Sequence, residues 1–390
     1  MNYFLTETEQ MIKDTAREVA QKYIKPVAAE YDEKNEFAWD VQEKIAEAGL
    51  CGVYIPETYG GICPEGQMGI MNLVVAVEEL SKVCGGISLG LAATALGTIP
   101  LILFGNEEQK QKYLPAIAAG EKLAAFALTE ACAGSNAGGI QTTARKEGDY
   151  YILNGTKQWI TNGGEADVYT VCAMTDPGRG ARGASFFIVE KGTPGFTFGK
   201  KENKMGIRAS ATRELVFQDC RVPKENLIWG RGRGFFVAMK TLDQSRPSVA
   251  AQALGIAEGA LACAVKYSRE RRQFGQPLCA NQGYLFMLSD MATKVEAAKS
   301  LVYRCAQAMD AGLKDISKIS AMAKCYASDV AMSVTTDAVQ ALGGYGYMKE
   351  YPVEKMMRDA KITQIYEGTN QIQRDVIGKA LIKEAASGQI

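Results

Sequence analysis

Histidine is absent from this 390-residue sequence. Histidine is the side chain whose charge ordinarily changes near neutral pH. Its absence excludes Ser-His-Asp and Cys-His catalysis and every zinc or iron site that needs an imidazole ligand. Proton transfer near neutral pH must therefore fall to a carboxylate, lysine, tyrosine or cysteine side chain, or to a cofactor.

Close cysteine pairs are missing as well. The ten cysteines are scattered and form no C-x-x-C pair. This excludes the spacing of zinc ribbons and ferredoxin-type clusters, and we expect no metal site. Free thiols in a chain of this length favour a reducing compartment.

An excess of charge of either sign is also lacking, because 44 Lys+Arg balance 44 Asp+Glu. Such a balance gives no global attraction to nucleic acid or to an anionic membrane. No apolar run reaches the length of a membrane span, and residues 1–7 resemble neither a signal peptide nor an Arg-rich presequence. We expect a soluble, cytoplasmic protein, or a mature chain whose targeting segment has been removed.

The glycine-rich nucleotide motifs G-x-G-x-x-G and G-x-x-x-x-G-K-[ST] do not occur in a strand-to-helix context. This disfavours a Rossmann dehydrogenase and a P-loop ATPase. The nearest glycine-rich segment, residues 230–234, is interpreted as a turn between a β segment and a helix.

Hydrophobic spacing divides the chain into three parts, of which the first is helical. Thr6 and Glu9 form a capping-box pattern, and Asp40 is a candidate cap for a second helix. Further helices are expected at about 71–81 and from Asn106 to near Pro115.

The second part is rich in short β-type runs separated by turn formers, which predicts an antiparallel β sandwich or barrel. Long helices are then expected at about 235–271, where Pro247 could introduce a kink, at 285–305 and 316–342, and beyond Thr369. The predicted fold is an α+β multidomain protein. It has an N-terminal helical domain (1–121), a middle antiparallel β sandwich or barrel (122–232) and a C-terminal four-helix bundle (233–390).

Two segments of the predicted β part suit a flat or anionic ligand. In residues 126–138, small residues expose backbone N–H groups, and Thr129 and Ser135 add hydroxyls, which suits a phosphate or a flavin edge. Trp159 could cover a flat ring, and Thr161 could hydrogen-bond a ring nitrogen. A structural loop and a core aromatic remain the alternative interpretations.

A third segment, residues 365–371, places Glu367 between an aromatic residue and a glycine, just before a helix that Thr369 would cap. The alternative interpretation of this carboxylate is a charge placed favourably beside a helix dipole.

Together these segments resemble the acyl-CoA dehydrogenase flavoprotein family. The similarity covers essentially the whole chain and extends through residues 271–275, 340–347 and 351–361. It implies the same three-part fold. It also implies oxidation of a short-chain acyl-CoA to 2-enoyl-CoA with FAD, and transfer of electrons to an electron-transfer flavoprotein.

The resemblance assigns Glu367 as the catalytic base that removes the α-proton, while the β-hydrogen leaves as hydride to flavin N5. The family polarises the thioester carbonyl with the backbone N–H of this glutamate and a flavin ribityl hydroxyl. Some members take the base from the position that is Ser245 here, so Glu367 stands alone and the isovaleryl and long-chain subgroups are disfavoured.

The resemblance also implies the binding residues, and a homotetramer in which subunits complete each other's sites. The substrate-binding residues would be Ser135, Asp243, Arg246, Tyr366 and Gly368. The FAD-binding residues of the subunit's own site would be Phe126, Leu128, Thr129, Gly134, Ser135, Trp159, Ile160, Thr161, Thr369, Asn370 and Gln371. Those that reach the FAD of a neighbouring subunit would be Arg271, Gln273, Phe274, Gln282, Gln340, Ala341, Leu342, Gly343 and Gly344.

The sequence departs from the family pattern at two positions. Ala131 stands where many members have proline, which loosens the loop, and Asn136 stands where many have aspartate, which removes one negative charge near the cofactor.

The acyl group is specified less directly. Residues 88–96, which match the family's acyl-pocket helix, contain no arginine, so a dicarboxylic substrate is disfavoured. Tyr366 and the similarity to butyryl-type sequences favour a short straight chain, whereas Gly90, Ala92 and Ala93 could admit a branched or cyclic group. Two other functions stay open: an enoyl-CoA reductase working in reverse in an anaerobe, and a non-catalytic acyl-CoA-binding helical scaffold.

Overall fold

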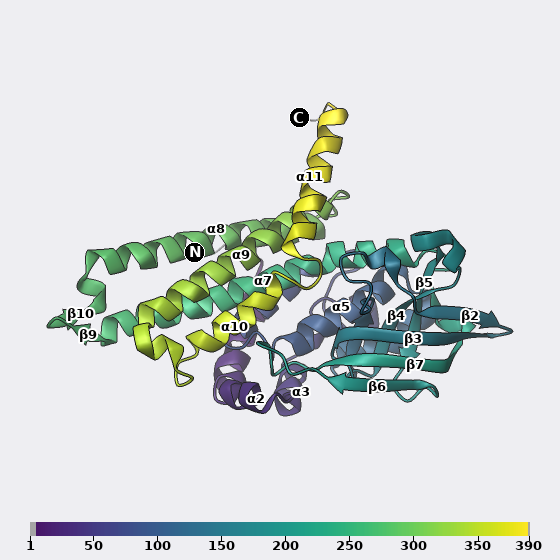
Figure 1. Cartoon of the computed structure of the whole chain (residues 1–390), viewed down its shortest axis with the longest axis horizontal. Coiled ribbons are helices and arrows are strands. Elements are labelled where there is room, and N and C mark those ends of the chain that lie inside the picture. The colour runs from purple at the N-terminus through teal and green to yellow at the C-terminus, as the bar shows by residue number, and fades with distance from the viewer. Residues whose placement is uncertain (1–4, 389–390) are drawn as a thin grey trace.

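The computed structural model describes residues 5–388, which form helices, then a sheet, then helices again. The sheet lies at one end of the molecule, and the long C-terminal helices reach toward the other end (Figure 1). This order is the one that the sequence predicts, so the predicted fold class is confirmed.

The N-terminal part begins with the predicted capping box, in which the Glu9 N–H donates to Thr6 Oγ1 (3.2 Å) and the Thr6 N–H donates to Glu9 Oε2 (2.7 Å). The helices of this part are α1 (Glu7–Val19), followed by a π-helical turn (Ala20–Ile24), α2 (Ala28–Lys34), α3 (Trp39–Glu47), α4 (Ile70–Ser81), α5 (Leu89–Phe104) and α6 (Glu107–Ala118).

Two expectations for these helices are wrong in detail. Asp40 does not cap α3, because the helix begins at Trp39 and the Asp40 carboxylate lies in its first turn, where it accepts from the Tyr31 hydroxyl. Helix α6 does not stop at Pro115 but continues to Ala118, since burial of Leu114 and Ile117 outweighs the one backbone hydrogen bond that proline removes.

The middle part is one sheet with the strand order β6-β7-β3-β2-β4-β5-β8, and β1 pairs with β4 beside this path. Most pairs are antiparallel as predicted, but β1 runs parallel to β4, and β2 and β4 share one parallel pair. The strands are β1 (Ala124–Ala127), β2 (Thr143–Glu147), β3 (Tyr150–Thr161), β4 (Val168–Met174), β5 (Ala184–Glu190), β6 (Phe196–Lys201), β7 (Thr212–Pro223) and β8 (Leu227–Ile228).

The C-terminal part packs four helices against one another, and a fifth, α11, packs on α9 and then projects away from the others (Figure 1). The helices are α7 (Gly234–Glu270), α8 (Gln282–Asp310), α9 (Ser317–Leu342), α10 (Val353–Thr363) and α11 (Asn370–Ala386). Between α7 and α8 lies a small hairpin of β9 (Arg272–Gln273) and β10 (Gln276–Pro277). The hydrophobic spacing predicts α11 as the fourth helix of the bundle. In the structure α10 takes that place, packed on both α7 and α9.

Helix α7 runs through Pro247 and forms the centre of the molecule, because it packs against α4 and α5 of the first part as well as α8, α9 and α10. Among residues 5–388 it is the one helix long and apolar enough to cross a membrane, but 67% of its most apolar window is buried by the rest of the chain. Such burial is typical of the core helix of a folded protein. One continuous hydrophobic core joins the N-terminal helices to the bundle.

Candidate active site

A cavity of about 650 Å³ lies where the three parts of the chain meet. Helix α5 contributes an apolar wall of Leu89, Ala92, Ala93 and Leu96, and β1, β3 and the loop that follows β1 form the opposite wall. Helix α7 and the loop before α11 close the remaining sides. The volume falls within the usual range of small-molecule and cofactor sites.

The loop after β1 is held by a buried ion pair. Lys157, on β3, is fully buried, and its Nζ donates to Glu130 Oε1 (2.7 Å) and to the Leu128 carbonyl (3.0 Å). The Glu130 carboxylate also accepts the backbone N–H groups of Gln141 and Thr142. Burial pushes the pKa of Glu130 up, but the charge and hydrogen bond of Lys157 outweigh it and lower that pKa. The loop is therefore fixed from behind, and its other side faces the cavity.

Trp159 lies on a β-bulge, where the register of β3 against β7 shifts between Lys157 and Ile160. Its φ of 58° is in the left-handed region, which is unusual for a bulky residue and is stored strain when it occurs in a site. Trp159 is 55% exposed and lines the cavity together with Ile160 and Thr161. The alternative interpretation of Trp159 as a core aromatic is therefore wrong.

Glu367 lies in the loop between α10 and α11, with a left-handed φ of 51°, and its side chain lines the cavity. The hydroxyl of Ser245, on α7, donates a hydrogen bond to Glu367 Oε2. Burial raises the pKa of Glu367 above the ordinary value of a glutamate. The Ser245 hydrogen bond and the charges of Arg246 and Lys324 oppose that rise. The predicted cap Thr369 is present, because its Oγ1 accepts the N–H of Ile372 (3.3 Å) at the start of α11.

Tyr366, beside Glu367, is fixed by a chain of hydrogen bonds. Its hydroxyl donates to Gln252 Oε1, and Gln252 Nε2 donates to the Gly85 carbonyl (2.8 Å). Because Gln252 is buried on α7, the position of Tyr366 is tied to the central helix.

Arg246 is buried on α7 and also lines the cavity. Its Nη1 donates to Asp243 Oδ1 (2.8 Å), while the buried Nε has no hydrogen-bond partner within residues 5–388. Asp243 in turn is held by the hydroxyl groups of Ser317 and Ser320 on α9. An unpartnered buried donor at a cavity wall suits a polar or anionic group of a ligand.

The structure brings most of the residues predicted for the subunit's own site to this cavity. Those that line it are Phe126, Leu128, Thr129, Gly134, Ser135, Trp159, Ile160, Thr161, Arg246, Tyr366, Glu367, Gly368 and Thr369. Asp243, Asn370 and Gln371 are close to this set in the chain but are not part of its wall.

The residues predicted to reach a neighbouring subunit do not line this cavity. Arg271, Gln273 and Phe274 lie at the β9–β10 hairpin, which Figure 1 shows at the end of the molecule opposite the sheet. The Phe274 side chain is 97% exposed. Gln282 begins α8, and residues 340–344 span the end of α9.

Sequence reasoning missed Lys157, Gln252 and Lys324, and it treated Ser245 as an absent base, not as a hydrogen-bond donor to the base. Lys157 and Lys324 are each fully buried, a rare state for a lysine. A lysine inside an apolar or β-type run is the sequence signal that could have drawn attention to them.

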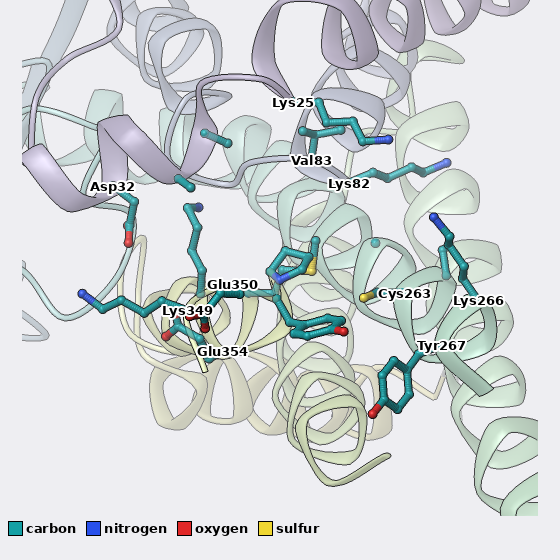
Figure 2. A pocket seen from close by; sticks show the side chains of 18 of the residues that line it. Lys25, Asp32, Lys82, Val83, Cys263, Lys266, Tyr267, Lys349, Glu350 and Glu354 are labelled. Atoms are coloured by element: carbon teal, nitrogen blue, oxygen red, sulfur yellow. The ribbon is translucent and has the colours of Figure 1, made fainter. Parts of the chain in front are cut away.

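A second cavity, of about 1,020 Å³, lies between the second half of α7, α10 and the N-terminal helices. Figure 2 shows that side chains of both charges surround it, including Lys82, Lys349 and Glu354, with Cys263 and Tyr267 on its α7 side. It is the larger of the two, but it contains neither Glu367 nor the glycine-rich loop. The chemistry that the sequence predicts is therefore at the first cavity.

Three family models match nearly the whole chain. They are described as acyl-CoA dehydrogenase, N-terminal domain (residues 6–121), middle domain (residues 125–220) and C-terminal domain (residues 232–382).

Individual relatives match over almost their full length. The solved structure of butyryl-CoA dehydrogenase from Megasphaera elsdenii is 50% identical, with a TM-score of 0.95, and the match covers 98% of this chain and 100% of that one. A structure described as the electron transferring flavoprotein of Acidaminococcus fermentans contains a chain that is 55% identical, with a TM-score of 0.94 and coverage of 98% and 99%. The acryloyl-CoA reductase (NADH) of Anaerotignum propionicum is 47% identical, over 98% of this chain and 96% of its own length.

Proposed function

Since this chain belongs to the acyl-CoA dehydrogenase family, we propose that it oxidises a short-chain acyl-CoA to 2-enoyl-CoA with FAD as its cofactor and Glu367 as the base. The observation that carries this proposal is the Glu367 carboxylate on the wall of the 650 Å³ cavity, with its pKa raised by burial. A base of raised pKa is better matched to a weakly acidic carbon than an exposed glutamate.

The wall opposite α5 fits the FAD of this family. It combines an exposed indole, Trp159, with hydroxyl groups from Thr129, Ser135 and Thr161. The Lys157–Glu130 pair ties the hydroxyl-bearing loop to β3. When bound, FAD supplies the acceptor for the β-hydrogen, which leaves as hydride.

The residues of the chain then have separate tasks. Glu367 takes the α-proton, and its backbone N–H is one donor to the thioester carbonyl. The apolar residues of α5 cover the acyl group and exclude water, which strengthens every charge interaction in the site. The unpartnered Nε of Arg246 is placed for a polar group in the CoA portion.

A short acyl chain is supported by the butyryl-CoA dehydrogenase relative, and the α5 wall offers it an apolar surface. Within residues 88–96 there is no arginine to bind a distal carboxylate. Ala92 and Ala93, which line the cavity, keep a branched or cyclic acyl group as the alternative substrate. Gly90 does not contribute to this prediction, because it packs against Gln42 and is not part of the cavity wall.

The test is anaerobic bleaching of the bound flavin. Purified protein should be yellow, and butyryl-CoA should bleach it. A panel of straight, branched and cyclic acyl-CoA thioesters then ranks the acyl groups. Glu367→Gln should retain FAD and slow bleaching by about 10²–10⁴-fold, the usual contribution of a general base. A variant that bleaches at the wild-type rate would remove Glu367 from the mechanism, and a colourless protein that gains no flavin on adding FAD would favour the acyl-CoA-binding scaffold.

A second candidate function is the same reaction in reverse, as an enoyl-CoA reductase. The 47% identical acryloyl-CoA reductase favours it, and the same residues would serve either direction because a catalyst accelerates both. The flavin potential with substrate bound, together with rates measured in both directions with the electron partner, decides between the two.

The electron partner is proposed to be an electron-transfer flavoprotein, on the strength of the Acidaminococcus structure. We further propose a cytoplasmic homotetramer in which Arg271, Gln273, Phe274, Gln282 and residues 340–344 bind the FAD of a neighbouring subunit. The nearly complete exposure of Phe274 supports this arrangement. Light scattering gives the number of subunits, and Phe274→Ala should lower FAD retention without unfolding the chain.

The domain boundaries 1–121, 122–232 and 233–390 are part of the same proposal. The ranges of the three matching family models, 6–121, 125–220 and 232–382, support them. Limited proteolysis of the purified protein should cut at or near these boundaries.

A further inference from the structure

Helix α9 carries a lysine, Lys324, that is fully buried directly behind the loop of the base. Its Nζ donates to the Gly368 carbonyl (2.8 Å) and to Asn370 Oδ1 (3.0 Å). Both acceptors are neutral, although a buried cation usually requires a charged partner. Burial accordingly lowers the pKa of Lys324 to about 8, against the opposing pull of Glu367.

These contacts hold a strained piece of backbone. Glu367 and Gly368 have φ values of 51° and 92°, both in the left-handed region, and a glutamate adopts this conformation only when its surroundings impose it. Two side chains from outside the loop hydrogen-bond to its carbonyl groups. Lys324 binds the Gly368 carbonyl, and Gln373, on α11, donates to the carbonyl oxygens of Glu367 (3.1 Å) and Gly368 (2.9 Å).

The two side chains that bind the loop differ in charge. Gln373 is neutral, whereas Lys324 places a cation on the α9 side of the Glu367 carboxylate, and Arg246 places another on the α7 side. Each of these helices also carries a compensating acid: Asp243 binds Arg246, and Asp329 binds Asn370 Nδ2 (2.7 Å). Asp329 is in turn bound by Arg374 of α11 (2.6 Å). Among the described residues, the charges that act directly on Glu367 are therefore the two cations.

We propose that Lys324 is a positioning residue for the base. Its hydrogen bond to the Gly368 carbonyl keeps the Glu367 side chain pointing into the cavity, and its positive charge keeps the Glu367 carboxylate ionised. This inference rests on the proposed function, because it assigns to Lys324 a task in the reaction of Glu367. Misplacement of a reacting group by a small distance is costly, on the order of 10²-fold in rate for 1 Å.

The test compares Lys324→Met with Gln373→Met by following anaerobic flavin bleaching with butyryl-CoA across pH. Lys324→Met loses both the hydrogen bond to the Gly368 carbonyl and the positive charge. Its rate should fall roughly 10- to 100-fold, and the rising limb of its pH profile should move to higher pH, because a carboxylate without its cation keeps its proton longer. Gln373→Met loses hydrogen bonds to the loop but no charge. Its bleaching rate should therefore fall by the same factor at every pH, and the rising limb of its pH profile should not move.

A third variant separates these effects from loss of stability. Lys13→Met removes another buried lysine, which binds Glu78 and Tyr303 and does not line the cavity. It should lower Tm while leaving the bleaching rate and the pH limb of the folded protein unchanged. If Lys324→Met does not fold, Lys324→Gln keeps a donor for Gly368 without the charge, and it should shift the limb with a smaller loss of rate.

The outcomes separate the two proposals. A wild-type protein that is not bleached by any thioester of the panel overturns the proposed function. The role of Lys324 alone is overturned by a different result. In that result the wild-type protein is bleached, and a folded Lys324→Met or Lys324→Gln variant has the wild-type pH dependence and a rate within about twofold of wild type.

Discussion

The Ser245 hydroxyl on α7 donates a hydrogen bond to Oε2 of Glu367, 122 positions later in the chain. In the sequence Ser245 appears only as a position without a carboxylate. In the structure it is the neutral partner that stabilises the ionised form of Glu367, and this hydrogen bond lowers a pKa that burial raises.

Replacing Ser245 with alanine should therefore raise the pKa of Glu367 further. The base must be ionised to take a proton, so the rising limb of the bleaching rate against pH should move to higher pH. A hydrogen bond to a charged group is worth ~1.5–3 kcal/mol, which corresponds to about one to two pH units. Stopped-flow bleaching with butyryl-CoA at a series of pH values measures the shift.

Ser268→Ala is the matched control for this experiment. Ser268 is a buried serine on the same helix, but its hydroxyl donates to the Val265 carbonyl (2.7 Å) and it does not line the cavity. Its pH limb should coincide with that of wild type. A Ser245→Ala profile that also coincides with wild type would show that the serine does not act on the base.

Lys157 should matter for cofactor binding more than for the chemistry. Lys157→Met leaves Glu130 as a buried charge without its partner, which typically costs about 3–5 kcal/mol. The loop over residues 128–138 should then lose its fixed conformation, and the purified variant should retain less FAD and melt at a lower temperature. The ratio of flavin to protein absorbance and a thermal melt measure both effects.

Lys224→Met provides the comparison for Lys157, because Lys224 pairs with Asp149 at 2.5 Å on the surface of the sheet part. An exposed ion pair contributes little to stability. Its loss should leave flavin content and Tm almost unchanged. If both variants behave alike, the buried pair does not hold the cofactor loop.

The three-part order of this fold can be predicted from the sequence because it follows from the local spacing of hydrophobic residues. Thr6 and Glu9 cap α1 as predicted, since a capping box needs only neighbours three residues apart. Helix α5 was not found from spacing, because it is buried on nearly every side and shows no polar face to set a period.

The site residues also fall into those that a local sequence motif indicates and those that depend on distant contacts. Glu367 and Trp159 lie in short motifs that can be read from a single sequence. Lys157, Ser245 and Lys324 act through partners 27, 122 and 44 positions away, and a contact of that kind exists only after folding. The left-handed φ of Trp159 comes from a register shift between two strands, which no local pattern specifies.

Trp159 should bind the flat ring of the cofactor through its exposed face. Trp159→Ala removes that face, and burial of an aromatic side chain is worth about 1.5–3 kcal/mol. The Kd for FAD should therefore rise by roughly 10- to 100-fold, whereas Trp159→Phe should retain most of the affinity. Titration of apoprotein with FAD, followed by flavin fluorescence, measures both constants.

Trp229 is the matched residue for this comparison. It is also exposed (43%) and left-handed (φ 59°), but it packs against Phe104 and Arg233 and does not line the cavity. Trp229→Ala should not change the affinity for FAD. An equal loss of affinity in Trp159→Ala and Trp229→Ala would mean that the Trp159 indole makes no specific contact with FAD.

The raised pKa of Glu367 also predicts a cost in stability. Because burial raises this pKa, the folded state holds the proton more tightly than the unfolded chain does. The stability from that proton is complete below the ordinary glutamate pKa and is lost as pH rises through the raised value. Glu367→Gln resembles the protonated side chain at every pH, so it should be more stable than wild type near neutral pH and equally stable in mild acid.

Thermal melts of wild type and Glu367→Gln at about pH 4 and pH 8 measure this difference. We expect Tm to be higher in the variant at the upper pH, by about 1 °C for each kcal/mol that ionisation of the buried carboxylate costs in a chain of this length. The exposed Glu121 supplies the control, because Glu121→Gln should leave Tm unchanged at both pH values. Equal melts of wild type and Glu367→Gln at the upper pH would mean that the carboxylate is ionised in the folded protein without cost. A base held in that state would not have the raised proton affinity on which the proposed α-proton abstraction depends.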